Sequence, residues 1–220
     1  MYSVVKRIMD FLASLVVLFL LTPLLLPIMI ILRLTGEGEI FYLQKRRGYK
    51  NKYFNIIKFA TMLKASPSLG TGSITLRDDY RVLPIGKYLR KTKINELPQI
   101  INVLIGDMSL VGPRPLVDRT FEAYPQHIQE RVYDRKPGIT GIGSVIFRDE
   151  ERMISQSNME PHEFYRKVIA PYKGALELWY QQHVSFWTDL KIIFLTIWVV
   201  LFPDTNLPYQ IFKNLPKRNF

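Results

Sequence analysis

A long apolar run dominates the start of the chain: positions 11–32 are 22 consecutive residues without a charge. As a straight helix they extend about 33 Å, close to the thickness of the hydrocarbon core of a bilayer. A cleaved signal peptide is the competing interpretation. It is disfavoured by Asp10 ahead of the run, by the length of the run, and by the lack of an A-x-A-like site before Arg33. We therefore expect residues 1–35 to form a retained membrane anchor.

Positive charges lie on both sides of this run, and they bear on its topology. Lys6 and Arg7 precede it, and six lysines and arginines follow between positions 33 and 52. The positive-inside tendency places both flanks in the cytoplasm, which a straight span cannot satisfy. Pro23 and Pro27 interrupt the helical hydrogen bonds near the middle of the run, so we expect a re-entrant helix hairpin broken at these prolines. A kinked spanning helix is the alternative.

After the anchor, short β-rich segments and helical patterns alternate without internal repeats. This alternation predicts an α+β, mostly helical domain over residues 36–220. Residues 40–43 and 53–57 are rich in strand-forming residues bounded by Gly and Asn, and they predict a small β-hairpin. Ser, Pro and Gly at 65–72 predict an exposed loop.

Two later segments suggest contact with a membrane surface. Basic and apolar residues interleave over 81–90, which is typical either of an amphipathic helix on lipid headgroups or of a solvated surface helix. Residues 172–200 are aromatic and apolar and suit a membrane interface. The apolar part at 190–202 is too short to span, so core packing or interfacial burial is expected there.

Composition narrows the partner of this chain. It has 220 residues, a formal net charge of +11 and no cysteine, so disulfide and thiolate chemistry are excluded. The charge indicates nucleic acid, an anionic lipid surface or a phosphorylated substrate, and composition alone does not choose among them. Aromatic residues cluster beside apolar runs instead of alternating with cations, so we expect no nucleic-acid partner. The three histidines are scattered and support neither a zinc site nor a Ser-His-Asp triad.

The segment 90–115 carries the most informative chemistry. Apolar residues recur there at helical spacing, which predicts a helix with Asn95 as N-cap, Pro98 in the first turn and Gly106 at the end. Glu96 then lies at a helix N-terminus, where unpaired N–H groups and the helix dipole favour phosphate, and where a carboxylate can hold Mg²⁺. An N-cap Asn followed by Glu is also ordinary helix chemistry that needs no substrate.

Two segments rich in glycine and proline add cations. Arg114 lies between Pro113 and Pro115, whose rings restrict the backbone, and a guanidinium held in this way binds phosphate oxygens through a two-pronged fork. Residues 135–143 are typical of a flexible basic turn whose glycines let backbone N–H groups approach an anion, although many surface loops share this composition.

The run from Ile94 to Pro115 resembles the signature of the monotopic phosphoglycosyl transferases, bacterial sugar transferases that start glycan assembly on polyprenyl phosphate. The family pattern is a DELPQ-like stretch followed by NVLKGDMSLVGPRP, and this chain has NELPQ and NVLIGDMSLVGPRP. Further matching residues follow in the family's order: Lys6, Arg7 and Asp10; Gln44, Arg46 and Gly48; Lys58, Phe59, Thr61 and Met62; Pro137, Gly138, Ile139, Thr140 and Gly141; Asp189, Leu190 and Lys191. The resemblance covers nearly the whole chain.

This resemblance implies transfer of a phospho-sugar from a UDP-sugar to polyprenyl (undecaprenyl) phosphate. The products are a polyprenyl diphosphate-linked sugar and UMP, and the reaction initiates bacterial surface glycan or glycoconjugate assembly. The resemblance further implies a monotopic protein on the cytoplasmic face of the bacterial inner membrane, with residues 36–220 as catalytic domain, interfacial amphipathic helices and Mg²⁺ as cofactor. It also allows a homo-oligomer.

The resemblance assigns roles to individual residues as well. It implies that Glu96 is a catalytic residue and the metal ligand, and that Arg90 and Asp189 form an ion pair that orients the active-site helix. The residues expected to contact the substrates are Lys58, Arg90, Pro113, Arg114 and Arg148. Sugar specificity is expected in residues 144–153, where the resemblance is thinnest.

Asn95 is the main departure from the family pattern, which has a nucleophilic aspartate at this catalytic position. An amide cannot form the covalent phospho-sugar intermediate. Four explanations remain open: Glu96 is the nucleophile; the lipid phosphate attacks directly; the chain is a catalytically silent membrane scaffold or UDP-sugar-binding relative; or Asn95 is an engineered trap. We favour an active enzyme, because the other basic and metal-site motifs are intact.

Overall fold

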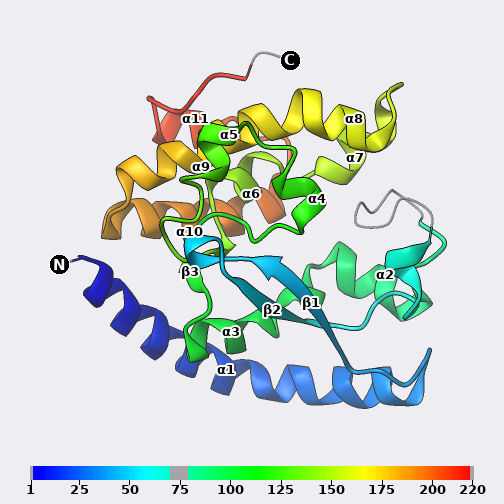
Figure 1. The fold of residues 1–220 in the computed structure, drawn as a ribbon. Coiled ribbons are helices and arrows are strands. Elements are labelled where there is room, and N and C mark those ends of the chain that lie inside the picture. The colour runs from blue at the N-terminus through cyan, green and yellow to red at the C-terminus, as the bar shows by residue number, and fades with distance from the viewer. Residues whose placement is uncertain (1, 70–78, 219–220) are drawn as a thin grey trace.

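The computed structural model describes residues 2–69 and 79–218. A long helix lies along one side, a β-hairpin and a short helix rest on it, and a larger group of helices lies beyond them (Figure 1). The fold is thus mostly helical with small β elements, as expected. The part of the predicted 65–72 loop after residue 69 lies outside the described residues.

The elements have the following bounds. The strands are β1 (Phe41–Arg47), β2 (Tyr53–Phe59), β3 (Ser109–Val111) and β4 (Gly138–Thr140). The helices are α1 (Tyr2–Leu34), α2 (Pro84–Lys91), α3 (Gln99–Ile105), α4 (Asp118–Phe121), α5 (Gln126–Gln129), α6 (Ile142–Ile146), α7 (Glu150–Gln156), α8 (Pro161–Phe164), α9 (Ala170–His183), α10 (Phe186–Leu201) and α11 (Leu207–Ile211). Short 3₁₀ turns cover Tyr49–Asn51, Ser66–Ser68 and Ile94–Glu96, and Tyr165–Ile169 is a π turn.

Helix α1 is continuous and contains both Pro23 and Pro27. It changes direction near its middle without leaving the helical conformation (Figure 1). The expected hairpin break is therefore not present. The two prolines lie four residues apart, so their missing N–H donors fall on one side of the helix, where they permit a bend. Within residues 2–69 and 79–218, α1 is the helix long and apolar enough to cross a membrane by length and composition.

The N-terminal half of α1 is fastened to the rest of the domain by polar contacts. Arg7 donates to two carbonyl oxygens in the last turn of α3, at 2.6 and 2.8 Å. A cation at this end of a helix satisfies carbonyls that have no partner inside the helix. Buried Asp10 accepts from Ser109 Oγ at 2.7 Å and from the backbone N–H of Leu110 at 3.1 Å. α1 is thereby joined to α3 and to β3.

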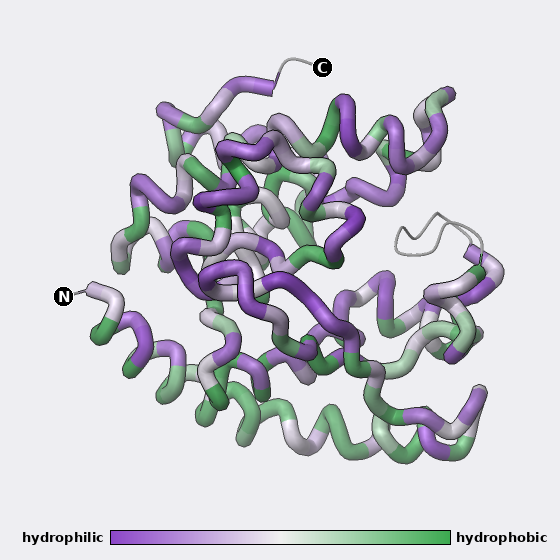
Figure 2. Tube along the Cα trace, viewed as in Figure 1, coloured by the Kyte–Doolittle hydropathy of each residue, from purple (hydrophilic) through white to green (hydrophobic). Residues whose placement is uncertain are grey.

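The C-terminal half of α1 is held by apolar packing. Leu25 and Leu32 are buried in a cluster with Phe59 of β2 and Leu89 of α2. The opposite side of the helix is exposed. Figure 2 colours most of α1 green, because most of its residues are apolar. This exposed face includes Val4, Ile8, Phe11, Leu12, Leu15, Val16, Phe19, Leu20, Leu24, Leu26, Ile30 and Ile31. α1 therefore lies along the domain and presents an apolar face that the described chain leaves uncovered.

Strands β1 and β2 form the antiparallel hairpin that the sequence predicts, with Phe41 opposite Phe59 and Arg47 opposite Tyr53. Both strands extend beyond the expected residues. β1 includes the basic residues 45–47 at its end. Side chains alternate between the two faces of a strand, so charged residues can be accommodated on the face that does not pack on the core. The hairpin brings its basic side chains toward the end of β3.

Strands β3 and β4 pair in parallel and bring two glycine-containing segments into close contact. A Cβ on Gly138 would lie only 2.1 Å from the backbone nitrogen of Gly112. The segment 135–143 is therefore not the flexible anion-binding turn that its composition suggests. Its glycines allow backbone to pack on backbone, and its second half is β4 followed by the first residues of α6.

Replacing Gly138 with Ala should destabilise the domain by about 3 kcal/mol, at the upper end of what overpacking costs, because the neighbouring atom is backbone and cannot rotate away. For a chain of this size that loss lowers Tm by roughly 6–12 °C. Thermal unfolding of purified protein measures the change. A Tm equal to that of the unmodified chain would mean that the two segments are not packed as closely as described.

The main core lies between α9, α10 and α6. Ile142, Ile169, Leu176, Ile192 and Leu195 are fully buried there. Much of the segment 172–200, which was expected at a membrane interface, is therefore buried in the core instead. Trp179 and Tyr180 are buried core residues, whereas Phe186 and Trp187 at the start of α10 are exposed.

The basic stretch 81–90 also divides into two parts. Arg81 is buried and pairs with Asp79 at 2.6 Å, so it does not face solvent or lipid. Helix α2 begins three residues later, where Pro84 occupies its first turn. Only α2 itself fits the expected amphipathic helix, with Tyr88 exposed and Leu89 buried.

Candidate functional site

A buried carboxylate forms the centre of a group of cations. Glu96 Oε1 accepts from Lys58 Nζ at 2.9 Å and from Arg114 Nη2 at 2.7 Å, and Arg114 Nη1 lies 3.4 Å from Oε2. Lys58 comes from β2 and Arg114 from the loop after β3. Three residues that the sequence marks as site candidates are thus in direct contact.

Glu96 does not lie in the first turn of α3. Ile94–Glu96 form a separate 3₁₀ turn, and α3 begins at Gln99. The residue before the turn, Lys93, has a φ of 60°, a left-handed conformation that is uncommon outside glycine. The prediction of Asn95 as N-cap is therefore wrong, since Lys93 starts a new turn and leaves Asn95 inside it. α3 does end at Gly106, which has a φ of 98°.

Mutual charge sets the protonation of this cluster. Burial alone raises the pKa of Glu96, but the charges of Arg114, Lys58 and Lys93 outweigh it and hold that pKa well below its usual value. Burial, with the charges of Arg114 and Arg46, lowers the pKa of Lys58 to about 8. Four cations therefore surround one carboxylate. The excess of positive charge favours binding of an anion.

Arg46 of β1 supports the loop that carries Arg114. Its Nη1 donates to the carbonyl oxygen of Pro115 at 3.3 Å, and its Nε and Nη2 donate to Gln44 Oε1 at 3.1 and 2.5 Å. Burial and the charge of Arg114 lower the pKa of Arg46 to about 10. In the sequence, Arg46 stands out only as part of the motif with Gln44 and Gly48. Arg46 and Gln44 are two residues apart, so both side chains lie on one face of the strand. This spacing is the sequence feature that could have indicated their contact.

A buried tyrosine holds the same loop in place. The hydroxyl of Tyr133 donates to the carbonyl oxygen of Arg114 at 2.9 Å and accepts from the backbone N–H of Leu116 at 2.9 Å. The carbonyl oxygen of Pro113 accepts from the backbone N–H of Gly138 at 2.9 Å, so this proline also anchors the loop. Tyr133 was not among the expected site residues, because no local sequence pattern distinguishes it from other core tyrosines.

Two further candidates have buried polar atoms without partners. Asn95 is buried, and its Oδ1 has no hydrogen-bond partner. Burial lowers the pKa of Lys93, and the charge of Arg148 lowers it further, which places Arg148 near Lys93. The Nε of Arg148 is buried and unpartnered as well. Polar atoms that are buried and unsatisfied are rare in folded proteins, and here they lie beside a cationic site.

The predicted ion pair between Arg90 and Asp189 is not formed. Arg90 Nη2 donates to Glu151 at 3.1 Å, whereas Asp189 accepts from Lys6 Nζ at 2.5 Å and from two tyrosine hydroxyls at 2.7 Å. The reason is the position of the helices. Asp189 lies in the first turn of α10 and faces the N-terminal end of α1, while Arg90 lies in the last turn of α2 and faces α7. The expected orientation of the active-site helix by an Arg90–Asp189 pair is therefore not found.

The oxygen donors at the site are compatible with Mg²⁺. The parts of the chain that the structure describes hold no group of three His, Cys, Asp or Glu side chains suited to a metal. Mg²⁺ at phosphate-handling sites needs only one or two protein oxygens, with phosphate and water as the other ligands. Glu96 Oε2 and the unpartnered Oδ1 of Asn95 are hard donors of this kind. They fit Mg²⁺ bound together with a phosphorylated ligand.

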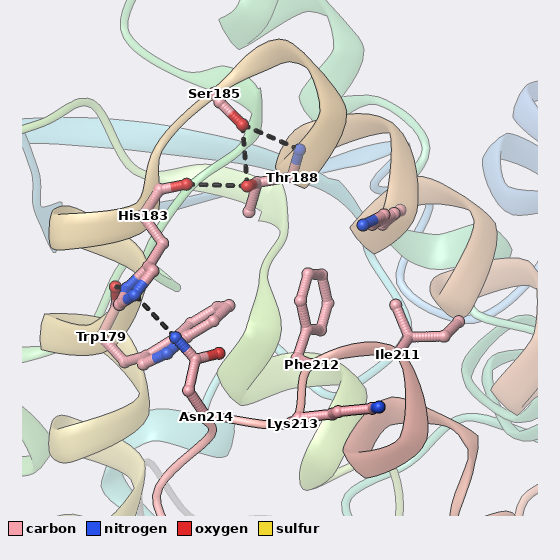
Figure 3. A pocket seen from close by; sticks show the side chains of 9 residues that line it. Trp179, His183, Ser185, Thr188, Ile211, Phe212, Lys213 and Asn214 are labelled. Atoms are coloured by element: carbon pink, nitrogen blue, oxygen red, sulfur yellow. Dashed lines mark hydrogen bonds between the residues drawn. The ribbon is translucent and has the colours of Figure 1, made fainter.

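A hollow of about 520 Å³ lies elsewhere, between α9, α10 and residues 211–214 (Figure 3). In this hollow the ring of His183 stacks on Trp179, and its Nε2 lies 2.9 Å from Asn214 Nδ2. None of its lining residues belongs to the cluster around Glu96. The chemistry of that cluster therefore does not use this hollow.

Comparison with known proteins agrees with the sequence resemblance. Residues 1–203 match the family model described as bacterial sugar transferase. The chain is 37% identical over 200 residues to an undecaprenyl-phosphate glucose phosphotransferase of Komagataeibacter xylinus, covering 87% of this chain and 35% of that protein. It is 35% identical over 208 residues to a UDP-N-acetylgalactosamine-undecaprenyl-phosphate N-acetylgalactosaminephosphotransferase of Aeromonas hydrophila, covering 91% and 44%.

A third relative is closer in length to this chain. The uncharacterized sugar transferase EpsL of Bacillus subtilis (strain 168) is 35% identical over 198 residues, which cover 90% of this chain and 88% of EpsL. The chain thus spans less than half of the first two relatives and most of the third.

Proposed function

Because the chain belongs to the bacterial sugar transferase family, we propose that it transfers a phospho-sugar from a UDP-sugar to polyprenyl phosphate. The products are a polyprenyl diphosphate-linked sugar and UMP. The printed names of two relatives, which pair undecaprenyl phosphate with a glucose or N-acetylgalactosamine phosphotransferase activity, support this reaction class.

The observation that carries the proposal is one buried carboxylate, Glu96, whose charge interacts with four cations. Lys58 and Arg114 contact it directly, and Arg46 and Lys93 are near enough to interact with its charge. The reaction brings together a diphosphate and a lipid phosphate, so several negative charges must be neutralised at once. Lys58, Arg114 and Arg148 bind the phosphates, and Arg46 holds the Arg114 loop.

The lipid phosphate attacks directly in the proposed mechanism. One of its oxygens forms a bond to the sugar-bearing phosphorus, the bond from that phosphorus to the bridging oxygen breaks, and UMP leaves with the electron pair. Asn95 cannot serve as nucleophile, because an amide lacks the charge for it. Glu96 is a poor nucleophile, because Lys58 and Arg114 both donate hydrogen bonds to its Oε1 and because its pKa is well below the usual value. The protein therefore positions and neutralises the reacting groups.

Glu96, together with the amide oxygen of Asn95, would hold Mg²⁺. The metal would supply positive charge to the phosphate oxygens and to the leaving UMP. Within this arrangement Arg114 has two tasks, since it keeps Glu96 ionised and offers its other N–H groups to the substrate.

The proposed location is the cytoplasmic face of the bacterial inner membrane, with α1 embedded through its apolar outer face. A helix that crossed the bilayer would carry one of its ends away from the domain, but both halves of α1 contact it. Arg7 and Asp10 are tied to α3 and β3, and Leu32 packs on the hairpin side. These contacts support a monotopic arrangement in which both ends of α1 lie on the same side of the membrane.

Asn95 favours a second candidate, a catalytically silent relative that binds UDP-sugar in the membrane. Its side chain is buried and its Oδ1 has no partner, while the cations that would bind a diphosphate are all in place. Such a protein would bind uridine diphosphate sugars without turnover.

Measurement of UMP release distinguishes the two candidates. The detergent-purified chain is given a panel of UDP-sugars, Mg²⁺ and undecaprenyl phosphate, beside an Asn95→Asp variant. Lipid-dependent release by the unmodified chain is the expected result. Silence of the unmodified chain, converted to activity by Asn95→Asp, would support the second candidate instead. Silence of both proteins with uridine diphosphate bound would also contradict turnover.

The pKa of Lys58 predicts an alkaline limit for this reaction. As pH rises through about 8, Lys58 loses the charge that binds phosphate, so kcat/KM should fall. Lys58→Arg should move that fall to higher pH, because a guanidinium stays charged.

The stability of the folded protein should change in the opposite direction. Between pH 8 and 10.5, Lys58 binds more protons in the unfolded chain than in the folded one, so this residue adds stability as pH rises. Rates and Tm measured from pH 6 to 10 test both signs.

A further inference from the structure

Glu177 is an acidic residue in the middle of α9, and only 1% of its surface is exposed. Neither carboxylate oxygen makes a hydrogen bond of good geometry. Burying a carboxylate costs free energy unless hydrogen bonds or an opposite charge compensate for the lost water. Glu177 does not touch Glu96, and the chemistry proposed above does not involve it. Its position therefore needs a separate explanation.

The side chain of Glu177 lies beneath a crossing of two backbone segments, the loop after β3 and the segment that follows β4. A Cβ on Gly141 would lie 2.2 Å from the carbonyl oxygen of Gly112, and a Cβ on Gly143 would lie 2.4 Å from Glu177 Oε1. The backbone N–H of Arg114 faces the carboxylate closely enough to lower its pKa. Glu177 is thus directly under the loop that carries the guanidinium.

We propose that Glu177 is a positioning residue for Arg114. Its carboxyl holds the two crossing segments together and so keeps the guanidinium against Glu96, where phosphate binds. The inference deepens the proposed function, because the phosphate in question is the diphosphate of the UDP-sugar. Tyr133 also holds the Arg114 loop, through the carbonyl oxygen of Arg114.

The protonation state of Glu177 gives this role a pH dependence. Burial raises the pKa of Glu177 to about 7, against the opposing effects of Lys173 and Arg114. Two cations lie near it: Arg114 of the loop after β3, and Lys173 of α9, which pairs with Glu150 of α7. Two tyrosines from the segments before β4, Tyr124 and Tyr133, also interact with its charge. A neutral carboxyl donates one hydrogen bond and accepts another, which suits a crossing that offers both C=O and N–H groups. Ionisation removes the donor and places negative charge under the loop.

Binding of uridine diphosphate to the full chain in detergent tests the proposal by calorimetry between pH 5.5 and 7.5, below the range in which Lys58 loses its charge. Glu177→Gln keeps a donor and an acceptor but cannot ionise, so it should bind within about twofold of the unmodified chain at pH 5.5 and show no weakening toward pH 7.5. Glu177→Leu should bind about tenfold more weakly at both pH values. Glu130→Gln, at an exposed carboxylate, is the matched control.

Hydrogen–deuterium exchange of residues 109–116 needs no ligand, and it separates this proposal from the proposed function. After correction for the chemical pH dependence, exchange should increase from pH 5.5 to 7.5 in the unmodified chain, stay level in Glu177→Gln, and be fast throughout in Glu177→Leu. Equal impairment of both variants at pH 5.5, or exchange that neither variant changes, would overturn the proposal. If uridine diphosphate fails to bind while exchange follows the expected pattern, the proposed function fails and the role of Glu177 stands.

Discussion

Glu96→Gln should reduce UMP release by about 10²–10³-fold, a loss typical of removing one stabilising group from an active site. The substitution preserves size but removes the negative charge that Lys58 and Arg114 share. The charge of Glu96 also raises the pKa of Lys58, so without it Lys58 titrates below about 8 and is partly neutral near physiological pH. Under the proposed mechanism the variant therefore loses the carboxylate that would hold Mg²⁺, together with part of the positive charge of the site.

Initial rates with a saturating UDP-sugar measure this effect, and Glu130→Gln on the exposed surface is the matched control. A second measurement checks the cause. The pH profile of the residual activity should shift toward acid, because Lys58 is more easily deprotonated. Retention of full activity would show that Glu96 is neither a metal ligand nor a regulator of Lys58. An unchanged pH profile with reduced activity would leave only the metal role.

Asp189→Ala should destabilise the protein by about 3–5 kcal/mol, the cost of removing one partner from a buried ion pair. Asp189 is buried, and it accepts from Lys6, Tyr2 and Tyr180. Its removal leaves a cation without a counter-charge and releases the N-terminal end of α1. Tm in detergent and sensitivity of residues 2–34 to proteolysis should both report the change.

A double-mutant cycle identifies the partner of Asp189. Lys6→Met combined with Asp189→Ala should cost clearly less than the sum of the single changes, because the unpaired charge is gone. Arg90→Ala should cost about 1 kcal/mol or less, since Arg90 pairs with the half-exposed Glu151, and it should add to Asp189→Ala without coupling. Strong coupling between Arg90 and Asp189 would contradict the arrangement described here.

Much of the site could be predicted because its residues lie in short, specific motifs. Glu96 and Arg114 are 18 positions apart within one signature, and Lys58 belongs to a second. Their convergence follows from the β-hairpin, whose strands are visible as β-rich runs. Arg46 and Tyr133 were not assigned roles, because each supports the Arg114 loop through backbone atoms of that loop, which the sequence does not place.

The errors in prediction have a common physical origin. Asn95 looks like an N-cap by spacing, but the left-handed conformation of Lys93 begins a separate turn. Pro23 and Pro27 look like a break, but a helix packed along its length can bend at proline and continue. Arg90 and Asp189 are 99 positions apart, and the choice of their partners depends on how α1, α7 and α10 pack. Local pattern does not determine such choices.

The packing of α1 makes this helix part of the framework that holds the Glu96 site. Arg7 closes the end of α3, the helix that begins directly after the Glu96 turn, and Asp10 holds β3, which leads into the Arg114 loop. A chain shortened to begin at residue 36 would therefore have a damaged site and would not be a water-soluble form of the same protein. With α1 embedded in a membrane as proposed, bilayer thickness and curvature would load this helix mechanically, and its contacts would pass such loads to the spacing between Glu96 and Arg114.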